Sequence, residues 1–206
     1  MTTRGPEEPR RYRPRTRDEL EPAQRELYDR IVGGPRAAQA AVVPITDAEG
    51  RLLGPFGPMT LAPAIGEAVQ SVGAALRFAG TLDAATKEAA ILLVGARRHC
   101  EYEWVLHVDA ARAAGLDEGQ LARLAEGELP SETGPADPDV LRLVIRLLDG
   151  GPISDTEYAR AVDALGESAL AEIVWLVGYY SMLALALRVF DPPIGSDRRA
   201  PWKTAE

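Results

Sequence analysis

Apolar residues recur at intervals of three and four along most of the chain, and glycine or proline interrupts each such run. This spacing predicts amphipathic helices, because residues three or four apart share one face of an α-helix. No segment shows the convincing apolar–polar alternation that is typical of half-buried strands. The sequence therefore predicts an all-α protein.

Helix breakers and capping residues indicate where these helices begin and end. Three predicted helices are bounded by proline or glycine: 22–33, 63–78 and about 167–190. Others begin at residues that favour helix N-termini: Asp83, Asp117, Asp137 and Ser154. A further helix carries Glu103 and His107 and ends near Gly115, and Gly166 ends the helix that Ser154 begins.

The distribution of polar residues predicts one domain with two tails. Residues 1–18 are rich in arginine and proline and are predicted to be a flexible tail; residues 19–193 are predicted to form one all-α domain, and 194–206 a second tail. Thr81–Leu116 and Ile153–Phe190 share a capped start and an apolar helical stretch, which raises the hypothesis of an internal helical duplication. The apolar loop 41–63 has two interpretations, namely packing over a pocket or packing on the surface.

The composition of the chain limits the kinds of molecule it is expected to bind and the compartment in which it is expected to lie. The net charge of −8 argues against a nucleic-acid surface. Ile173–Leu187 is the longest apolar run, and it is shorter than the roughly 20 residues that span a bilayer, so we expect a buried helix. The start of the chain has no apolar stretch of the signal-peptide type, and a single cysteine excludes an intrachain disulfide. A soluble cytoplasmic protein is expected.

The most informative motif is E-x11-C-x-x-E-x-x-x-H, formed by Glu88, Cys100, Glu103 and His107. The last three lie on one helix face, and a carboxylate beside an imidazole is a ready proton-transfer pair. In one unbroken helix, His99 and not Cys100 would lie over Glu88. Bringing all four residues together therefore requires a break in the helix near residues 97–101.

Each of these residues also has a purely structural interpretation. Glu88 could simply favour the positive end of its helix, and Cys100 could be a small buried hydrophobe. His107 could be a core histidine bonded to a backbone carbonyl, and Glu103 an ordinary i,i+4 partner of that histidine. Glu88, Glu103 and His107 could together reach one metal ion, but catalytic zinc sites commonly use more histidine. We predict no metal and no cofactor.

With these residues in view, the stretch from about Gly54 to Pro193 resembles the carboxymuconolactone decarboxylase family, which includes the alkylhydroperoxidase D-like proteins. Peroxidase-type members carry a second cysteine where this chain has Glu103, and their cycle needs both thiols. Decarboxylase-type members resemble an E-x-x-x-H pattern, which Glu103 and His107 fit. The chain looks like a subgroup with glutamate in the second cysteine position. The resemblance implies an alkylhydroperoxidase D-like helical bundle that assembles as a trimer or hexamer.

Three functional hypotheses follow. The first is a cofactor-independent decarboxylase, lyase or isomerase acting on a small organic acid or lactone, with His107 as the acid–base group oriented by Glu103 and Glu88 as a second relay. The second is a peroxide or thiol redox protein that uses Cys100 with an external resolving thiol. The third is a non-catalytic helical oligomer that binds a ligand. For a catalyst, the expected substrate-binding residues are Phe56, Met59, Arg77, Trp104, Tyr179 and Tyr180, although Trp104 and the tyrosines also suit a core.

Overall fold

Helices account for most of the computed structural model, which describes residues 11–34, 44–130, 133–195 and 198–203. In these ranges the chain also has two 3-10 helices, Arg17–Glu19 (η1) and Pro201–Lys203 (η3), and an isolated β-bridge between Thr46 and Leu52. The predicted all-α class is confirmed. The α-helices are α1 Pro22–Gly33, α2 Phe56–Met59, α3 Pro63–Phe78, α4 Ala84–Arg97, α5 Glu101–Ala113, α6 Glu118–Ala125, α7 Pro138–Asp149 and α8 Asp155–Phe190.

The helix ends follow from the capping chemistry that the sequence predicts. The Asp83 carboxylate accepts a hydrogen bond from the backbone N–H of Thr86 at 2.9 Å, and Asp117 caps α6 in the same way. Ser154 and Glu157 form the predicted capping box before α8. Gly166, with φ 78°, kinks α8 where two separate helices were predicted. The left-handed conformation suits glycine, which has no Cβ to clash.

The chain divides into two compact units. The first comprises residues up to Val72 together with Leu185–Gly195, and the second comprises Gly73–Ala184 together with the residues from Ser196 onward. This division differs from the single domain predicted over residues 19–193, because residues 185–195 return to the first unit and the end of the chain joins the second.

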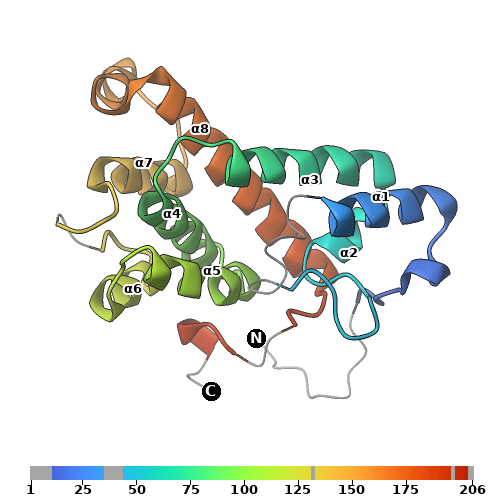
Figure 1. Cartoon of the computed structure of the whole chain (residues 1–206). Coiled ribbons are helices and arrows are strands. Elements are labelled where there is room, and N and C mark those ends of the chain that lie inside the picture. Colours follow the sequence, from blue (N-terminus) through green and yellow to red (C-terminus); the bar gives the residue numbers. More distant parts are fainter. Residues whose placement is uncertain (1–10, 35–43, 131–132, 196–197, 204–206) are drawn as a thin grey trace. The chain divides into compact units, whose positions relative to one another are not determined.

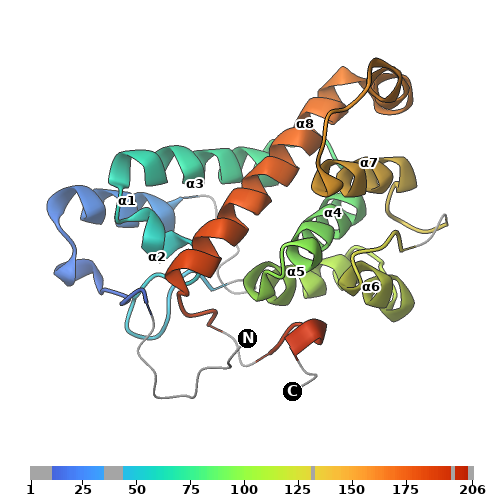
Figure 2. The same cartoon turned by 180° about the vertical axis from the view of Figure 1, so that it is seen from behind.

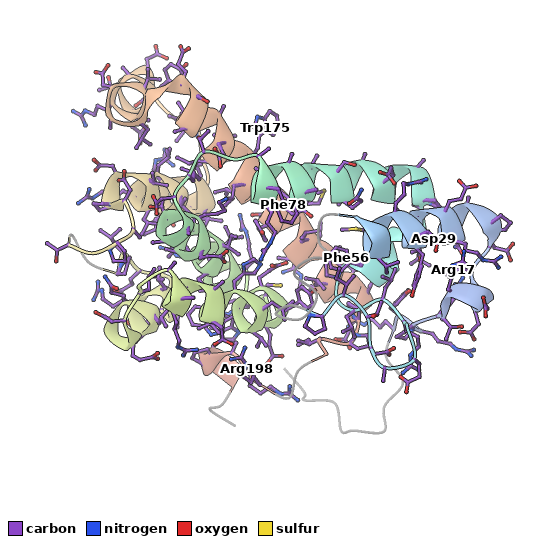
Figure 3. The ribbon with its side chains drawn as sticks, in the orientation of Figure 1. Arg17, Asp29, Phe56, Phe78, Trp175 and Arg198 are labelled. Atoms are coloured by element: carbon purple, nitrogen blue, oxygen red, sulfur yellow. The ribbon has the colours of Figure 1, made fainter. Side chains whose placement is uncertain are left out.

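The first unit contains α1, α2, the start of α3 and the end of α8. A Cβ added at Gly66 would lie 2.2 Å from the Met59 carbonyl oxygen, so only glycine permits this approach of α3 to α2. Arg17 and Asp29 form a bidentate ion pair, and their side chains face each other in Figure 3.

The N-terminal tail prediction is wrong for residues 11–18. Tyr12 is buried, and its backbone N–H donates to the carbonyl of Phe190 at 2.9 Å. Arg11 also donates to the carbonyls of Arg188 and Val189, and such side-chain bonds to a distant helix end leave no signal in the local pattern of charges and prolines. Residues 1–10 lie outside the described residues.

The second unit is built around α4, which contacts α5, α6 and α7. These four helices lie side by side in the two opposite views of Figures 1 and 2. The run from Ala89 to Ala96 is buried, which explains why it is apolar all round. Glu172 on α8 accepts hydrogen bonds from the backbone N–H and hydroxyl of Thr81 at 2.6 and 2.8 Å, so it anchors the turn before α4 to α8.

Residues 198–203 pack on α5, within the range 194–206 that was predicted to be a second tail. The Arg198 guanidinium donates to the carbonyl of Val105 at 3.0 Å, and the ring of Trp202 lies edge-on to Trp104 with centroids 5.3 Å apart. Ala200 is fully buried. These contacts make residues 198–203 part of the second unit.

α8 is the one described helix that is long and apolar enough to cross a membrane by length and composition alone. That test is weak, because the core helix of a soluble protein also passes it. Ile173 and Leu176 are buried, but Met182 and Leu185 are exposed, so the expectation of a buried helix over Ile173–Leu187 is met on one face only. Trp175, between Ile173 and Leu176 in sequence, is exposed.

Candidate active site

A tight turn between α4 and α5 supplies the break that the motif requires. His99 adopts a left-handed conformation with φ 51°. The N–H of Cys100 donates to the carbonyl of Gly95 at 2.8 Å, and the N–H of His99 donates to Ala96 at 3.0 Å. These two bonds form a Schellman motif, which closes α4 while Cys100 caps the start of α5. The turn therefore reverses the chain and lays α5 along α4.

This packing brings the imidazole of His107 between two carboxylates. Its Nδ1 lies 2.6 Å from Oε2 of Glu88 on α4, and its Nε2 lies 3.5 Å from Oε2 of Glu103 on its own helix. All three side chains are shielded from water, and Glu103 is only 1% exposed. The sequence spacing indicated Glu103 as the orienting partner of His107, but Glu88 makes the closer contact.

The two carboxylates have different affinities for a proton. Burial would raise the pKa of Glu88, but the charge and hydrogen bond of His107 outweigh it, helped by Arg77 and Lys87, and the pKa is lowered. Burial raises the pKa of Glu103 to about 7, with repulsion from Glu88 adding to the effect and attraction to His107 opposing it. Near neutral pH the site therefore holds one ionised carboxylate and one that readily carries a proton.

Glu103 has an oxygen with no partner among the described residues. Its Oε1 is buried and accepts or donates no hydrogen bond there. A buried carboxyl oxygen in this state costs free energy, which is compatible with a group kept available for chemistry. The unpaired oxygen also favours the protonated form, because a buried charge without partners is more costly than a neutral acid.

Two groups from neighbouring helices complete the surroundings. Tyr180 on α8 lies edge-on to the His107 ring, with centroids 5.5 Å apart at 90°. Burial and the nearby charges of Glu103, Tyr179 and Glu88 keep the pKa of Tyr180 well above its usual value, so the phenol is neutral. The positive charge of Arg77 on α3 acts on Glu88, Glu103 and Tyr180.

The Cys100 thiol is buried at the start of α5. Burial, and then repulsion from Glu103, raise the pKa of this thiol to about 12. Because the thiolate is the nucleophilic form, this environment suits a small buried side chain better than a reactive thiol.

The remaining predicted substrate-binding residues have other surroundings. Trp104 is buried against Trp202, and Tyr179 packs edge-on to Tyr180 with centroids 5.3 Å apart. Phe56 and Met59 are buried in the first unit, so their predicted role beside His107 stays a prediction. Within the described ranges, no group of three or more His, Cys, Asp or Glu side chains is placed to hold a metal ion.

Two features of the site were missed by sequence reasoning. The sequence did not distinguish Tyr180 from Tyr179, because adjacent positions in an apolar helix give no signal of which ring faces another helix. The contact of Trp202 with Trp104 was also missed, although a tryptophan within a polar terminal segment is a signal of docking.

One of the comparisons with known proteins found a family match over part of the chain. A comparison with curated proteins gave no match. A family match does cover the helices that carry the site, from the start of α3 into α7, and thus Glu88, Cys100, Glu103 and His107. The all-α architecture is consistent with the alkylhydroperoxidase D-like fold. Residues 63–145 match the sequence model of the Carboxymuconolactone decarboxylase family.

Proposed function

We propose that this protein is a cofactor-independent acid–base enzyme of the decarboxylase, lyase or isomerase type that acts on a small organic acid or lactone. The observation that carries the proposal is the imidazole of His107 held between Glu88 and Glu103 in a buried setting. The family match supports an enzyme of the decarboxylase or peroxidase-like kind. The assignment to a glutamate-containing subgroup stays a prediction.

Glu88 fixes the imidazole. As an ionised carboxylate it accepts a hydrogen bond from Nδ1–H of His107, which leaves Nε2 directed toward Glu103. The proton between Nε2 and Glu103 is then the one available for transfer, because the pKa of Glu103 is raised to about 7. Glu88 therefore orients the imidazole, and His107 and Glu103 transfer the proton.

Decarboxylation shows how the charges balance. The substrate carboxylate leaves as carbon dioxide, and its bonding electron pair stays on the substrate as an enolate-like anion. His107 and Glu103 then deliver one proton to that carbon, and solvent returns a proton to this pair. Arg77 supplies a positive charge that favours an acidic substrate, and its influence on Glu88 and Glu103 supports a place near the relay. The same groups serve isomerisation or lactone opening.

The thiol alternative is less well supported. A redox cycle begins with a thiolate, and burial opposes ionisation of Cys100. With Glu103 in place of a second cysteine, the resulting sulfenate would need an external thiol. A non-catalytic ligand-binding role has no observation in its favour beyond the helical fold.

The test is proton exchange at carbon, which reports decarboxylation and isomerisation alike. A panel of β-keto acids and unsaturated lactone acids is incubated with the enzyme in D2O, and deuterium incorporation and carbon dioxide release are followed by NMR. Replacing His107 by Gln should reduce the rate by roughly 10²–10⁴. Cys100→Ser is the matched control and should keep turnover. Full turnover in His107→Gln would refute the acid–base proposal.

A further inference from the structure

The enolate-like intermediate of the proposed reaction carries its negative charge chiefly on oxygen. Loss of carbon dioxide from a β-keto acid leaves an electron pair that is shared between the carbon and the neighbouring carbonyl oxygen. A hydrogen-bond donor aimed at such an oxygen contributes a large part of the rate in many enzymes. His107 and Glu103 transfer the proton and Glu88 holds the imidazole, so the oxygen needs a donor besides these three.

Tyr180 is a neutral O–H donor that lies against the imidazole. It belongs to the same compact unit as the three residues of the site, and its ring meets the His107 ring edge-on with centroids 5.5 Å apart. Burial raises the pKa of the phenol most, and the charges of Glu103, Tyr179 and Glu88 raise it further. The hydroxyl therefore lies within the field of both carboxylates and keeps its proton.

The two oxygens of Glu103 have different surroundings. Oε2 lies 3.5 Å from Nε2 of His107, whereas Oε1 is buried and has no hydrogen-bond partner among the described residues. A buried polar atom without a partner costs free energy, and a bound substrate can remove that cost. Oε2 thus serves the imidazole, and Oε1 is the oxygen of this carboxyl that is left for a substrate.

We propose that Tyr180 is a catalytic residue whose phenol O–H donates a hydrogen bond to the enolate oxygen of the substrate, while Oε1 of Glu103 faces the carbon that receives the proton. This inference rests on the proposed function and narrows its substrate class. The substrate is an acid in which a ketone or lactone carbonyl adjoins the carbon that bears the leaving carboxylate. Its carbonyl oxygen and that carbon are close enough to meet groups on α8 and α5 together.

The step balances with one proton. As carbon dioxide leaves, its bonding electron pair moves onto the substrate, and the carbonyl oxygen accepts the hydrogen bond of Tyr180. One proton passes from the pair of His107 and Glu103 through Oε1 to the carbon, and solvent returns a proton to the pair. The phenol keeps its own proton throughout. The positive charge of Arg77 acts on Tyr180 and on Glu103, which favours an anionic intermediate between them.

Tyr180→Phe separates hydrogen bonding from packing. The variant loses the O–H and keeps the ring that meets His107 edge-on. A residue that serves packing alone would therefore tolerate the change in both ligand binding and turnover. Tyr158→Phe is the matched control, because it is the same substitution on α8 at a side chain that is 52% exposed. Circular dichroism checks that both variants remain folded.

The first test uses 4-nitrophenol, whose phenolate resembles an enolate because its charged oxygen is attached to an sp² carbon. Binding to the full-length protein is measured by equilibrium dialysis. We expect Tyr180→Phe to weaken binding roughly 10–100-fold and Tyr158→Phe to leave it unchanged. 4-Nitrotoluene lacks the oxygen and should bind the natural protein and Tyr180→Phe equally. Unchanged affinity of Tyr180→Phe for 4-nitrophenol, or a natural protein that does not prefer 4-nitrophenol to 4-nitrotoluene, would overturn the proposal.

The second test repeats the proton-exchange assay in D2O with Tyr180→Phe. The donor stabilises charge that develops only during the reaction, so we expect kcat to fall roughly 10²–10³-fold with KM little changed. Full turnover in Tyr180→Phe together with slow turnover in His107→Gln would overturn this inference alone. Full turnover in His107→Gln would overturn the proposed function and this inference with it.

Discussion

The carboxylate of Glu88 lies 2.6 Å from Nδ1 of His107, although 19 positions separate the two residues. This contact is shorter than the 3.5 Å separation between His107 and Glu103, which are one turn apart on the same helix. The reversal at His99 makes the difference, because it places α5 along α4. A tertiary contact, and not the local i,i+4 pair, therefore orients the imidazole.

Stability should fall with rising pH because of Glu103. Its pKa is raised to about 7 in the folded protein from an ordinary value of 4.5, so the folded state binds this proton more tightly than the unfolded state. The stabilisation from this proton is complete below the unfolded pKa of 4.5 and is lost as the pH rises through 7, which lowers the free energy of unfolding by about 3 kcal/mol. Urea unfolding at several pH values between 4.5 and 7 measures this change.

Glu103→Gln should remove this pH dependence, because the amide does not titrate. Glu126→Gln, an exposed position at the end of α6, is the control and should keep the dependence of the natural protein. An unchanged pH dependence of the unfolding free energy in Glu103→Gln would show that Glu103 titrates normally.

Cys100 should react slowly with alkylating reagents. With a pKa of about 12, the thiolate fraction at pH 8 is about 10³-fold lower than for an ordinary cysteine. The rate of iodoacetamide labelling, followed by mass spectrometry, should therefore rise by at least that factor when the protein is unfolded in urea. Rapid labelling of the folded protein would instead indicate a reactive thiol.

The turn at His99 should tolerate glycine and resist branched residues. His99 has φ 51°, a conformation that costs roughly 1–2 kcal/mol for residues with a Cβ. We expect His99→Val to lower the free energy of unfolding, and His99→Gly to leave it unchanged or raise it. Thermal unfolding of both variants checks the order, and a more stable valine variant would contradict it.

Trp202 should contribute to the stability of the second unit. Trp202→Ala removes the edge-on contact with Trp104, and we expect a loss of about 1–3 kcal/mol with a red shift of Trp104 fluorescence as water reaches it. Arg199→Ala is the control on the same segment, since the Arg199 side chain is exposed and its ion pair with Glu101 is long, at 3.9 Å. Equal stability of the two variants would argue against a docked terminus.

Sequence alone was reliable where structure is decided locally. The caps at Asp83, Asp117 and Ser154 and the break at Gly166 were predicted because each depends on the chemistry of a few adjacent residues. The break between α4 and α5 was also inferred, from the demand that the motif residues meet. The short helix α2 was missed, since its prolines and glycine favour a loop.

The sequence by itself determined an all-α chain and which four residues to consider together. Only the tertiary structure decided that Glu88 is the partner of the His107 Nδ1, that Tyr180 and not Tyr179 faces the imidazole, and that residues 198–203 pack on α5. The physical reason is distance along the chain. Hydrogen bonding within a turn is encoded by neighbouring residues, whereas burial and charge at Glu103 depend on which helices surround it.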